Sequence, residues 1–190
     1  MPMRFHDPVH PLRKTGQLHR GRISSPGGRY FITFVTAGRK RWLAPNHFGQ
    51  QLVDVLSHSH NLSQCHCLAA TVMPDHAHVL FELGAALSVG QTVAMWKADV
   101  RRRIGHSEAF QRDFWEHRLG PDEEAEQYAL YMFLNPYRAG LIGGTESWPG
   151  WWLPDPRVFR FSQSLDAKNL PPKEWLVWPE AKFDRLAVGE

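Results

Sequence analysis

Strand-like and helix-like segments alternate along this 190-residue chain and predict an α+β fold, an antiparallel sheet with helices packed on it. Two observations carry the prediction. Runs rich in aromatic and β-branched residues are typical of strands, and runs with apolar residues every three to four positions are typical of amphipathic helices. In addition, only Pro74-Asp75 and their immediate neighbours separate two strand-like runs between residues 65 and 83. Such spacing indicates a tight turn and an antiparallel hairpin.

The first four elements follow from these patterns. Residues 29–36 (RYFITFVT) form the first predicted strand. A helix capped by Asn46 is expected to run to about Ser59, with apolar residues along one face. Residues 65–73 form the second strand and residues 76–83 the third.

Three further elements complete the predicted fold. Ser88 is expected to cap a helix that ends at Gly105. Residues 114–119 form a short fourth strand. The last helix is expected to open at Pro121-Asp122 and to close at Asn135-Pro136, because proline ends or kinks a helix. The order β-α-β-β-α-β is that of a ferredoxin-like antiparallel sheet with helices on one side, followed here by one additional helix.

Composition divides the chain into three parts. Residues 1–28 are expected to be a basic N-terminal arm, residues 29–142 the main domain, and residues 143–190 a Trp- and Pro-rich extension that wraps the domain or meets a partner. No apolar run is long enough to span a membrane. The only two cysteines, Cys65 and Cys67, are too close in sequence for an ordinary structural disulfide, which favours a cytoplasmic location.

The charge distribution indicates a polyanionic partner. The net charge is +3 and the sequence pI is about 9.0, a mild basic bias. Candidate phosphate-binding residues lie in the arm and on the second predicted helix: Arg20, Arg22, Lys97, Arg101 and Arg102. The alternative is that these side chains only form a solvated surface.

Four residues have the spacing of a metal-dependent catalytic site. His76 and His78 alternate along a strand, so both point to one face and can reach one metal ion. Tyr131 and Asn135 are four apart on the last helix and share a face, offering a nucleophilic phenol and an amide oxygen. The alternatives are a solvated histidine pair, a core tyrosine and a helix-capping asparagine. Tyr128 lies on the same helix face, and periodicity alone does not choose between the two tyrosines.

Two segments resemble motifs of a known family. Residues 73–81 (MPDHAHVLF) resemble the His-hydrophobic-His, or HUH, motif of single-tyrosine transposases. Residues 131–142 (YMFLNPYRAGLI) resemble the Tyr-x-x-x-Asn-Pro-x-x-Ala-Gly-Leu signature of the REP-associated tyrosine transposases, the RAYT branch. Residues 114–117 (FWEH) and the first strand also match that branch, and the resemblance extends in order over roughly residues 20–155.

The resemblance implies an enzyme that cuts and rejoins single-stranded DNA next to short hairpins through a 5′-phosphotyrosine intermediate. By motif position it implies that Tyr131 is the nucleophile and that His76, His78 and Asn135 hold a divalent metal, Mg²⁺ or Mn²⁺. Such a protein is expected to be nucleoid-associated, to use no nucleotide cofactor and to act as a monomer or homodimer. Two alternatives remain open: a metal-dependent nuclease that uses water, and a non-catalytic protein that binds DNA hairpins.

Overall fold

An antiparallel sheet of five strands, in the order β4-β1-β3-β2-β5, forms the centre of the computed structural model, which describes residues 24–179, 182–183 and 186. The strands are β1 (Arg29–Val35), β2 (Cys65–Val72), β3 (His76–Leu83), β4 (Trp115–Arg118) and β5 (Trp151–Trp152). The helices are α1 (Gln50–Asn61), α2 (Val89–Arg103) and α3 (Ala125–Arg138). The predicted α+β class and the ferredoxin-like order of the first four strands are confirmed.

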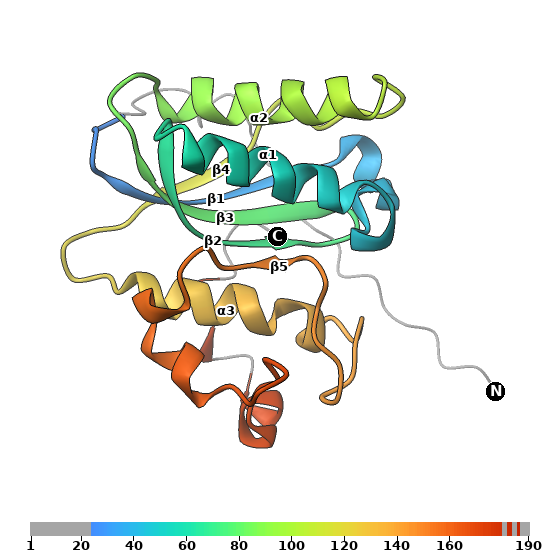
Figure 1. Ribbon diagram of the computed structural model, residues 1–190, viewed down its shortest axis with the longest axis vertical. Helices are drawn as coiled ribbons and strands as arrows, with labels where there is room; N and C mark the ends of the chain where they lie inside the picture. The colour runs from blue at the N-terminus through green and yellow to red at the C-terminus, as the bar shows by residue number, and fades with distance from the viewer. Residues whose placement is uncertain (1–23, 180–181, 184–185, 187–190) are drawn as a thin grey trace.

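Helices cover both faces of the sheet. Figure 1 shows α1 and α2 on one face, and α3 with the C-terminal segment on the other. Along β1 the side chains alternate between two cores: Ile32 and Phe34 pack towards α1 and α2, whereas Phe31 packs towards α3. Because successive strand residues point to opposite faces, a sheet covered on both sides is apolar along nearly its whole length.

Capping residues and turn residues in the sequence predicted most of the helix and strand boundaries correctly. The four predicted strands and the helix capped by Ser88 are confirmed, and Ser88 and Gln91 form a reciprocal capping box. The predicted cap at Asn46 is wrong. Residues Pro45–Gly49 form a wider π-type turn, and α1 begins only at Gln50. Gly49 permits this turn, since a Cβ there would lie 2.6 Å from the Leu43 carbonyl oxygen.

The predicted end of the last helix is also wrong, because α3 continues through Pro136 to Arg138. Proline has no N–H to donate to the carbonyl oxygen four residues earlier, that of Met132. The hydroxyl of Thr71 on β2 donates to this oxygen at 2.8 Å. A contact from the sheet therefore replaces the missing helical hydrogen bond.

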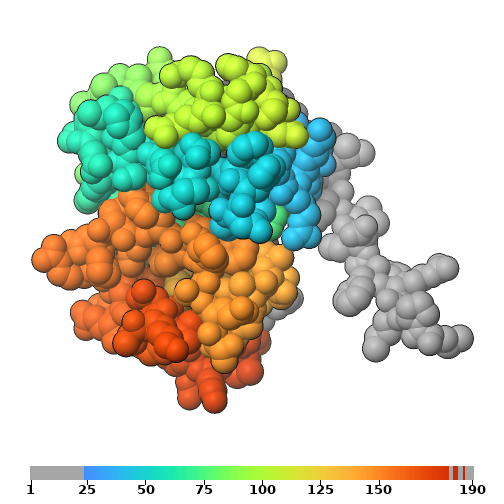
Figure 2. All heavy atoms as spheres, turned by 45° about the vertical axis from the view of Figure 1, so that its right-hand side comes forward, coloured from blue at the N-terminus to red at the C-terminus, as the bar shows by residue number. Residues whose placement is uncertain are grey.

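The C-terminal extension packs against the domain, which is one of the two expectations for it. β5 pairs with β2, and the indole N–H of Trp148 donates to the Val72 carbonyl oxygen at 2.9 Å. Phe159 and Phe161 are buried in the core beneath α3. In Figure 2 this segment, in orange, forms much of the surface on the side opposite α2. The structure describes no helix long and apolar enough to cross a membrane.

Candidate active site

The four candidate catalytic residues lie together between β3 and α3, on the sheet face that α3 covers. The amide Nδ2 of Asn135 lies 3.2 Å from His78 Nε2 and 3.4 Å from the Tyr131 hydroxyl. The rings of His76 and His78 are 4.9 Å apart, centroid to centroid. The spacing i, i+2 on the strand and i, i+4 on the helix therefore places these side chains in one cluster.

His78 is held in one orientation by its neighbours on both sides. It is almost fully buried, and its Nδ1 atom lies 2.8 Å from Oγ1 of Thr33, its cross-strand partner on β1. Because the Asn135 Nδ2 group can only donate, His78 Nε2 acts as an acceptor in this contact. The proton of a neutral His78 is then on Nδ1 and is donated to Thr33. This tautomer leaves the Nε2 lone pair directed into the site.

His76 is oriented by a carboxylate. Its Nδ1 atom lies 2.7 Å from Asp75 Oδ1, and the other carboxylate oxygen accepts a hydrogen bond of 3.1 Å from Arg39. Burial alone would raise the pKa of Asp75, but the contacts with His76 and Arg39 outweigh burial and lower it. Asp75 is therefore an ionised acceptor for the Nδ1 proton. The Nε2 atom of His76 is buried and has no hydrogen-bond partner among the described residues.

The two tyrosines of the shared helix face occupy different environments. The Tyr128 hydroxyl donates to the Glu123 carboxylate at 2.6 Å, and burial together with this contact raises the pKa of Tyr128. The Tyr131 hydroxyl instead lies beside Asn135, and the Tyr131 ring lies 5.8 Å from that of His78, centroid to centroid. Of the two tyrosines, only Tyr131 therefore has its hydroxyl beside Asn135.

Aromatic rings and one cation enclose the Tyr131 ring. Phe31 contacts it edge-on at 6.3 Å between centroids, and Phe183 lies at 6.0 Å. The guanidinium carbon of Arg138 is 5.7 Å from the centroid of the tyrosine ring. The ring is thus fixed by packing, with a positive charge close to it.

The donor atoms of the cluster fit a divalent metal ion. An unpartnered, buried imidazole nitrogen on His76 is costly unless another group takes its lone pair. The Nε2 atom of His78 lies 3.2 Å from the Asn135 amide nitrogen, and rotation of this amide by half a turn exchanges its donor for an acceptor oxygen. No cluster of three or more His, Cys, Asp or Glu with metal-binding geometry occurs in the described part of the chain, here or elsewhere, so the candidate ligand set is two histidines completed by an amide.

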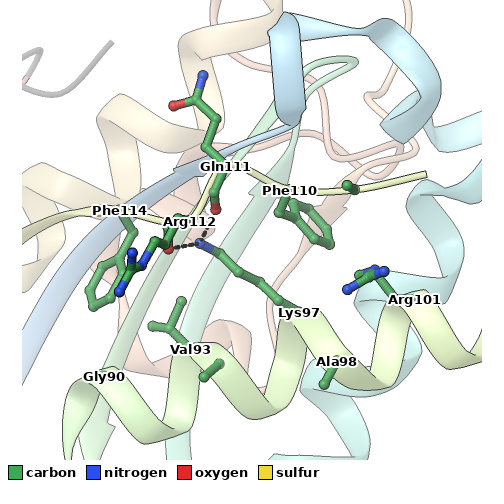
Figure 3. A pocket seen from close by; sticks show the side chains of 11 residues that line it. Gly90, Val93, Lys97, Ala98, Arg101, Phe110, Gln111, Arg112 and Phe114 are labelled. Carbon is green, nitrogen blue, oxygen red and sulfur yellow. Dashed lines mark hydrogen bonds between the residues drawn. The ribbon is translucent and has the colours of Figure 1, made fainter. Parts of the chain in front are cut away.

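The predicted DNA-binding residues on α2 differ in their surroundings. The Lys97 ammonium donates to the carbonyl oxygens of Gln111, Arg112 and Asp113 at 2.8, 3.3 and 3.2 Å, which indicates a structural role. Figure 3 shows the first two of these contacts. Arg102 pairs with Asp99 on its own helix, and Arg101 is exposed. All three lie on α2, across the sheet from Tyr131.

The two arm candidates, Arg20 and Arg22, lie outside the described residues. Sequence reasoning missed three residues beside the cluster: Asp75, Thr33 and Arg138. Asp75 directly precedes His76, and this position was the one sequence signal that could have indicated a contact with the imidazole. The contact of Thr33 arises from cross-strand pairing and that of Arg138 from tertiary packing, and neither leaves a sequence pattern.

Comparisons with known proteins agree with the motif resemblance. The model of a family described as "Transposase IS200 like" matches residues 25–120. A Haemophilus influenzae protein that bears the name REP-associated tyrosine transposase is 23% identical over 175 residues, which cover 83% of this chain and 92% of the relative.

A solved structure of a REP-associated tyrosine transposase bound to a REP hairpin has a TM-score of 0.64 and 21% identity. The match covers 89% of this chain and 94% of that one, and it shows a common fold. The family match includes the histidine hairpin but ends before α3, so it does not reach Tyr131 or Asn135.

Proposed function

The chain belongs to the family of IS200-like transposases, and on this premise we propose that it cleaves and rejoins single-stranded DNA beside hairpins, with Tyr131 as nucleophile. The observation that carries the proposal is that the Asn135 amide contacts both the Tyr131 hydroxyl and His78, whose ring lies next to that of His76. The similar transposase was solved with a REP hairpin, which supports hairpin DNA as the substrate here as well.

In this proposal His76, His78 and Asn135 hold a divalent cation, Mg²⁺ or Mn²⁺. The imidazoles contribute their Nε2 atoms and the asparagine its amide oxygen. When bound, such an ion polarises the scissile phosphate and offsets the negative charge that develops on it.

Asp75 and Thr33 prepare the two imidazoles. Each accepts a hydrogen bond from an Nδ1–H group, so both imidazoles direct their Nε2 atoms away from these partners. Carboxylates and hydroxyls in this position also hold the ring plane and increase the basicity of the ligand nitrogen.

Tyr131 carries the covalent step. Its oxygen bonds to the scissile phosphorus, the bond from phosphorus to the 3′ oxygen breaks, and that oxygen takes a proton to become a 3′-hydroxyl. The phenol loses its own proton to solvent as this bond forms, and the Arg138 guanidinium lies beside the ring. Attack by a 3′-hydroxyl on the phosphotyrosine reverses the step and joins strands. The phosphodiester energy is retained, so no nucleotide cofactor is needed.

The experiment uses an oligonucleotide with a short imperfect hairpin and single-stranded flanks, incubated with Mg²⁺ or Mn²⁺ and separated on a denaturing gel. A 3′-end label is expected to migrate with the protein, because the tyrosine keeps the 5′-phosphate of the downstream fragment. A 5′-end label is expected on a shorter free strand.

Tyr131→Phe should abolish the adduct. Tyr128→Phe is the matched control, because its hydroxyl is engaged by Glu123, and it should retain the adduct. Cleavage without an adduct that persists in both variants would instead identify a nuclease that uses water. Binding of the hairpin without any cleavage would identify a non-catalytic DNA-binding protein.

A further inference from the structure

A groove lies on the sheet face opposite Tyr131, away from the proposed catalytic residues. It lies between α2 and the segment of residues 109–114 and has a volume of about 270 Å³ (Figure 3). Its apolar wall includes the rings of Phe110 and Phe114, both half-buried. Arg101 and Arg112, both exposed, complete the lining at the surface.

The segment that forms one wall is fixed in place. Lys97 reaches across from α2 and donates to three successive carbonyl oxygens of the segment. At the other side, the Gln111 N–H donates to the Val35 carbonyl oxygen at 2.8 Å, and Phe110 forms a β-bridge with Thr36. The groove is therefore a preformed feature of the fold.

The lining has the chemistry of a single-stranded nucleic-acid site. No carboxylate lines the groove, whereas Arg101 and Arg112 present two cationic groups at its surface. Aromatic rings stack with any base, and arginines bind the adjoining phosphates, which is how proteins bind unpaired strands without sequence preference. The volume suits one nucleoside and is far too small for a duplex.

The groove is also close to the candidate active site across the sheet. Residues 109–111 lie beside the end of β1 at Val35, and Val35 pairs with His76 on β3. Adjacent strands are about 4.8 Å apart, so the segment is about 10 Å from β3 in the plane of the sheet. One DNA strand passing around this end of the sheet can contact both faces.

We propose that this groove binds one unpaired nucleotide of the single strand that flanks the cleaved bond. The base lies against Phe114 and Phe110, and the neighbouring phosphates contact Arg101 and Arg112. The inference rests on the proposed function, since it takes single-stranded DNA as the substrate. It adds a binding site for one nucleotide beside the cleaved bond.

The first test measures binding of fluorescein-labelled dT₁₀ to the full chain by anisotropy at several salt concentrations. Arg101→Gln and Arg112→Gln should each reduce the slope of log K against log salt by about 0.7, the value for one phosphate contact on a single strand. Phe114→Leu, which keeps an apolar side chain, should weaken binding by at least about fivefold through lost stacking. Arg103→Gln removes a charge from the same helix outside the groove and should leave the affinity nearly unchanged.

The second test needs no variant and therefore does not depend on mutant folding. A hairpin oligonucleotide with 5-iododeoxyuridine at successive flanking positions is crosslinked to the wild-type chain, and crosslinked peptides are identified by mass spectrometry. A crosslink at Phe110 or Phe114 from one flanking position is the expected result. Crosslinks confined to other surfaces, or equal affinity of Arg112→Gln and Arg103→Gln for dT₁₀, would overturn the proposal.

Failure of the two proposals can be told apart. If Tyr131 forms an adduct while groove variants bind DNA normally, the groove is not a nucleotide site and the transposase proposal stands. If the groove crosslinks to DNA but no adduct forms, the nucleotide site stands and the proposed chemistry fails.

Discussion

At the scale of single residues, the hydrogen bond between Asp75 and His76 has the most direct chemical consequence. The carboxylate is ionised, half-buried and oriented by Arg39, so it fixes the tautomer and the plane of the imidazole. The resulting geometry leaves a buried Nε2 atom without a hydrogen-bond partner among the described residues. A group that orients a metal ligand in this way typically contributes 10–100-fold to metal affinity.

Replacing Asp75 therefore should weaken metal binding without unfolding the protein. We expect Asp75→Asn to lower the affinity for Mn²⁺ about 10–100-fold, measured by isothermal titration calorimetry. Arg39→Gln, which removes only the outer contact, should have a smaller effect in the same direction. Asp122→Asn, an exposed acidic residue, is the matched control. Equal Mn²⁺ affinity in Asp75→Asn and Asp122→Asn would show that Asp75 does not orient a metal ligand.

At the scale of elements, the course of α3 depends on a hydrogen bond from the sheet. The Thr71 hydroxyl donates a hydrogen bond to the Met132 carbonyl oxygen. Pro136 lacks the backbone N–H that would otherwise donate to this oxygen in the helix. This contact keeps the helix continuous across Asn135, the residue directly before the proline. The position of the candidate ligand is therefore coupled to β2.

Thr71→Val should leave the Met132 carbonyl oxygen buried without a partner and lower the free energy of unfolding by about 1–3 kcal/mol. Pro136→Ala restores the backbone N–H that can donate to this oxygen. In the Pro136→Ala background, Thr71→Val should consequently cost less than in the wild type. Urea unfolding of the four proteins provides the double-mutant cycle. Additive effects would show that the two residues do not share the Met132 oxygen.

The junction between β4 and α3 is held by Glu123. The Gly120 backbone N–H, and then the Tyr128 hydroxyl and His117, lower the pKa of this carboxylate to about 2 from its usual 4.5. A group whose pKa is lower in the folded state stabilises the fold above its unfolded pKa. That contribution is lost as the pH falls from about 4.5 towards 2.

We expect the wild type to lose more stability than Glu123→Gln between pH 5 and pH 2.5, because only the wild type must protonate this carboxylate. The side chain of Glu123 is 36% exposed, so solvent screening moderates the difference. Urea unfolding at several pH values measures it. Parallel pH profiles of the two proteins would contradict a stabilising role for ionised Glu123.

At the scale of the whole molecule, features encoded locally were predictable and features created by tertiary contacts were not. Strands β1 to β4, the Ser88 cap and the His76-His78 alternation depend on neighbouring residues, and each was found from the sequence. The end of α3 depends on Thr71, more than 60 residues away. Strand β5 is only two residues long and forms through pairing with β2, so no periodicity marks it. The same distinction explains why Thr33, which is 45 residues from His78, was missed. Asp75 is adjacent to His76, and its position was a local signal that was not used.

The C-terminal extension should be required for folding, although its composition separates it from the preceding domain. The Phe133 ring of α3 packs 5.4 Å from Trp151 and 5.7 Å from Phe161, centroid to centroid. Loss of a large buried aromatic side chain typically costs about 3–5 kcal/mol, comparable to the stability of a small domain. A chain that ends at residue 142 should therefore lack a cooperative thermal transition, and Trp151→Ala should lower the melting temperature of the full chain. Val177→Ser, at a residue 80% exposed in the same extension, should change it little. A cooperative transition at the wild-type temperature in the chain ending at 142 would show instead that α3 and the sheet form a complete core without the extension.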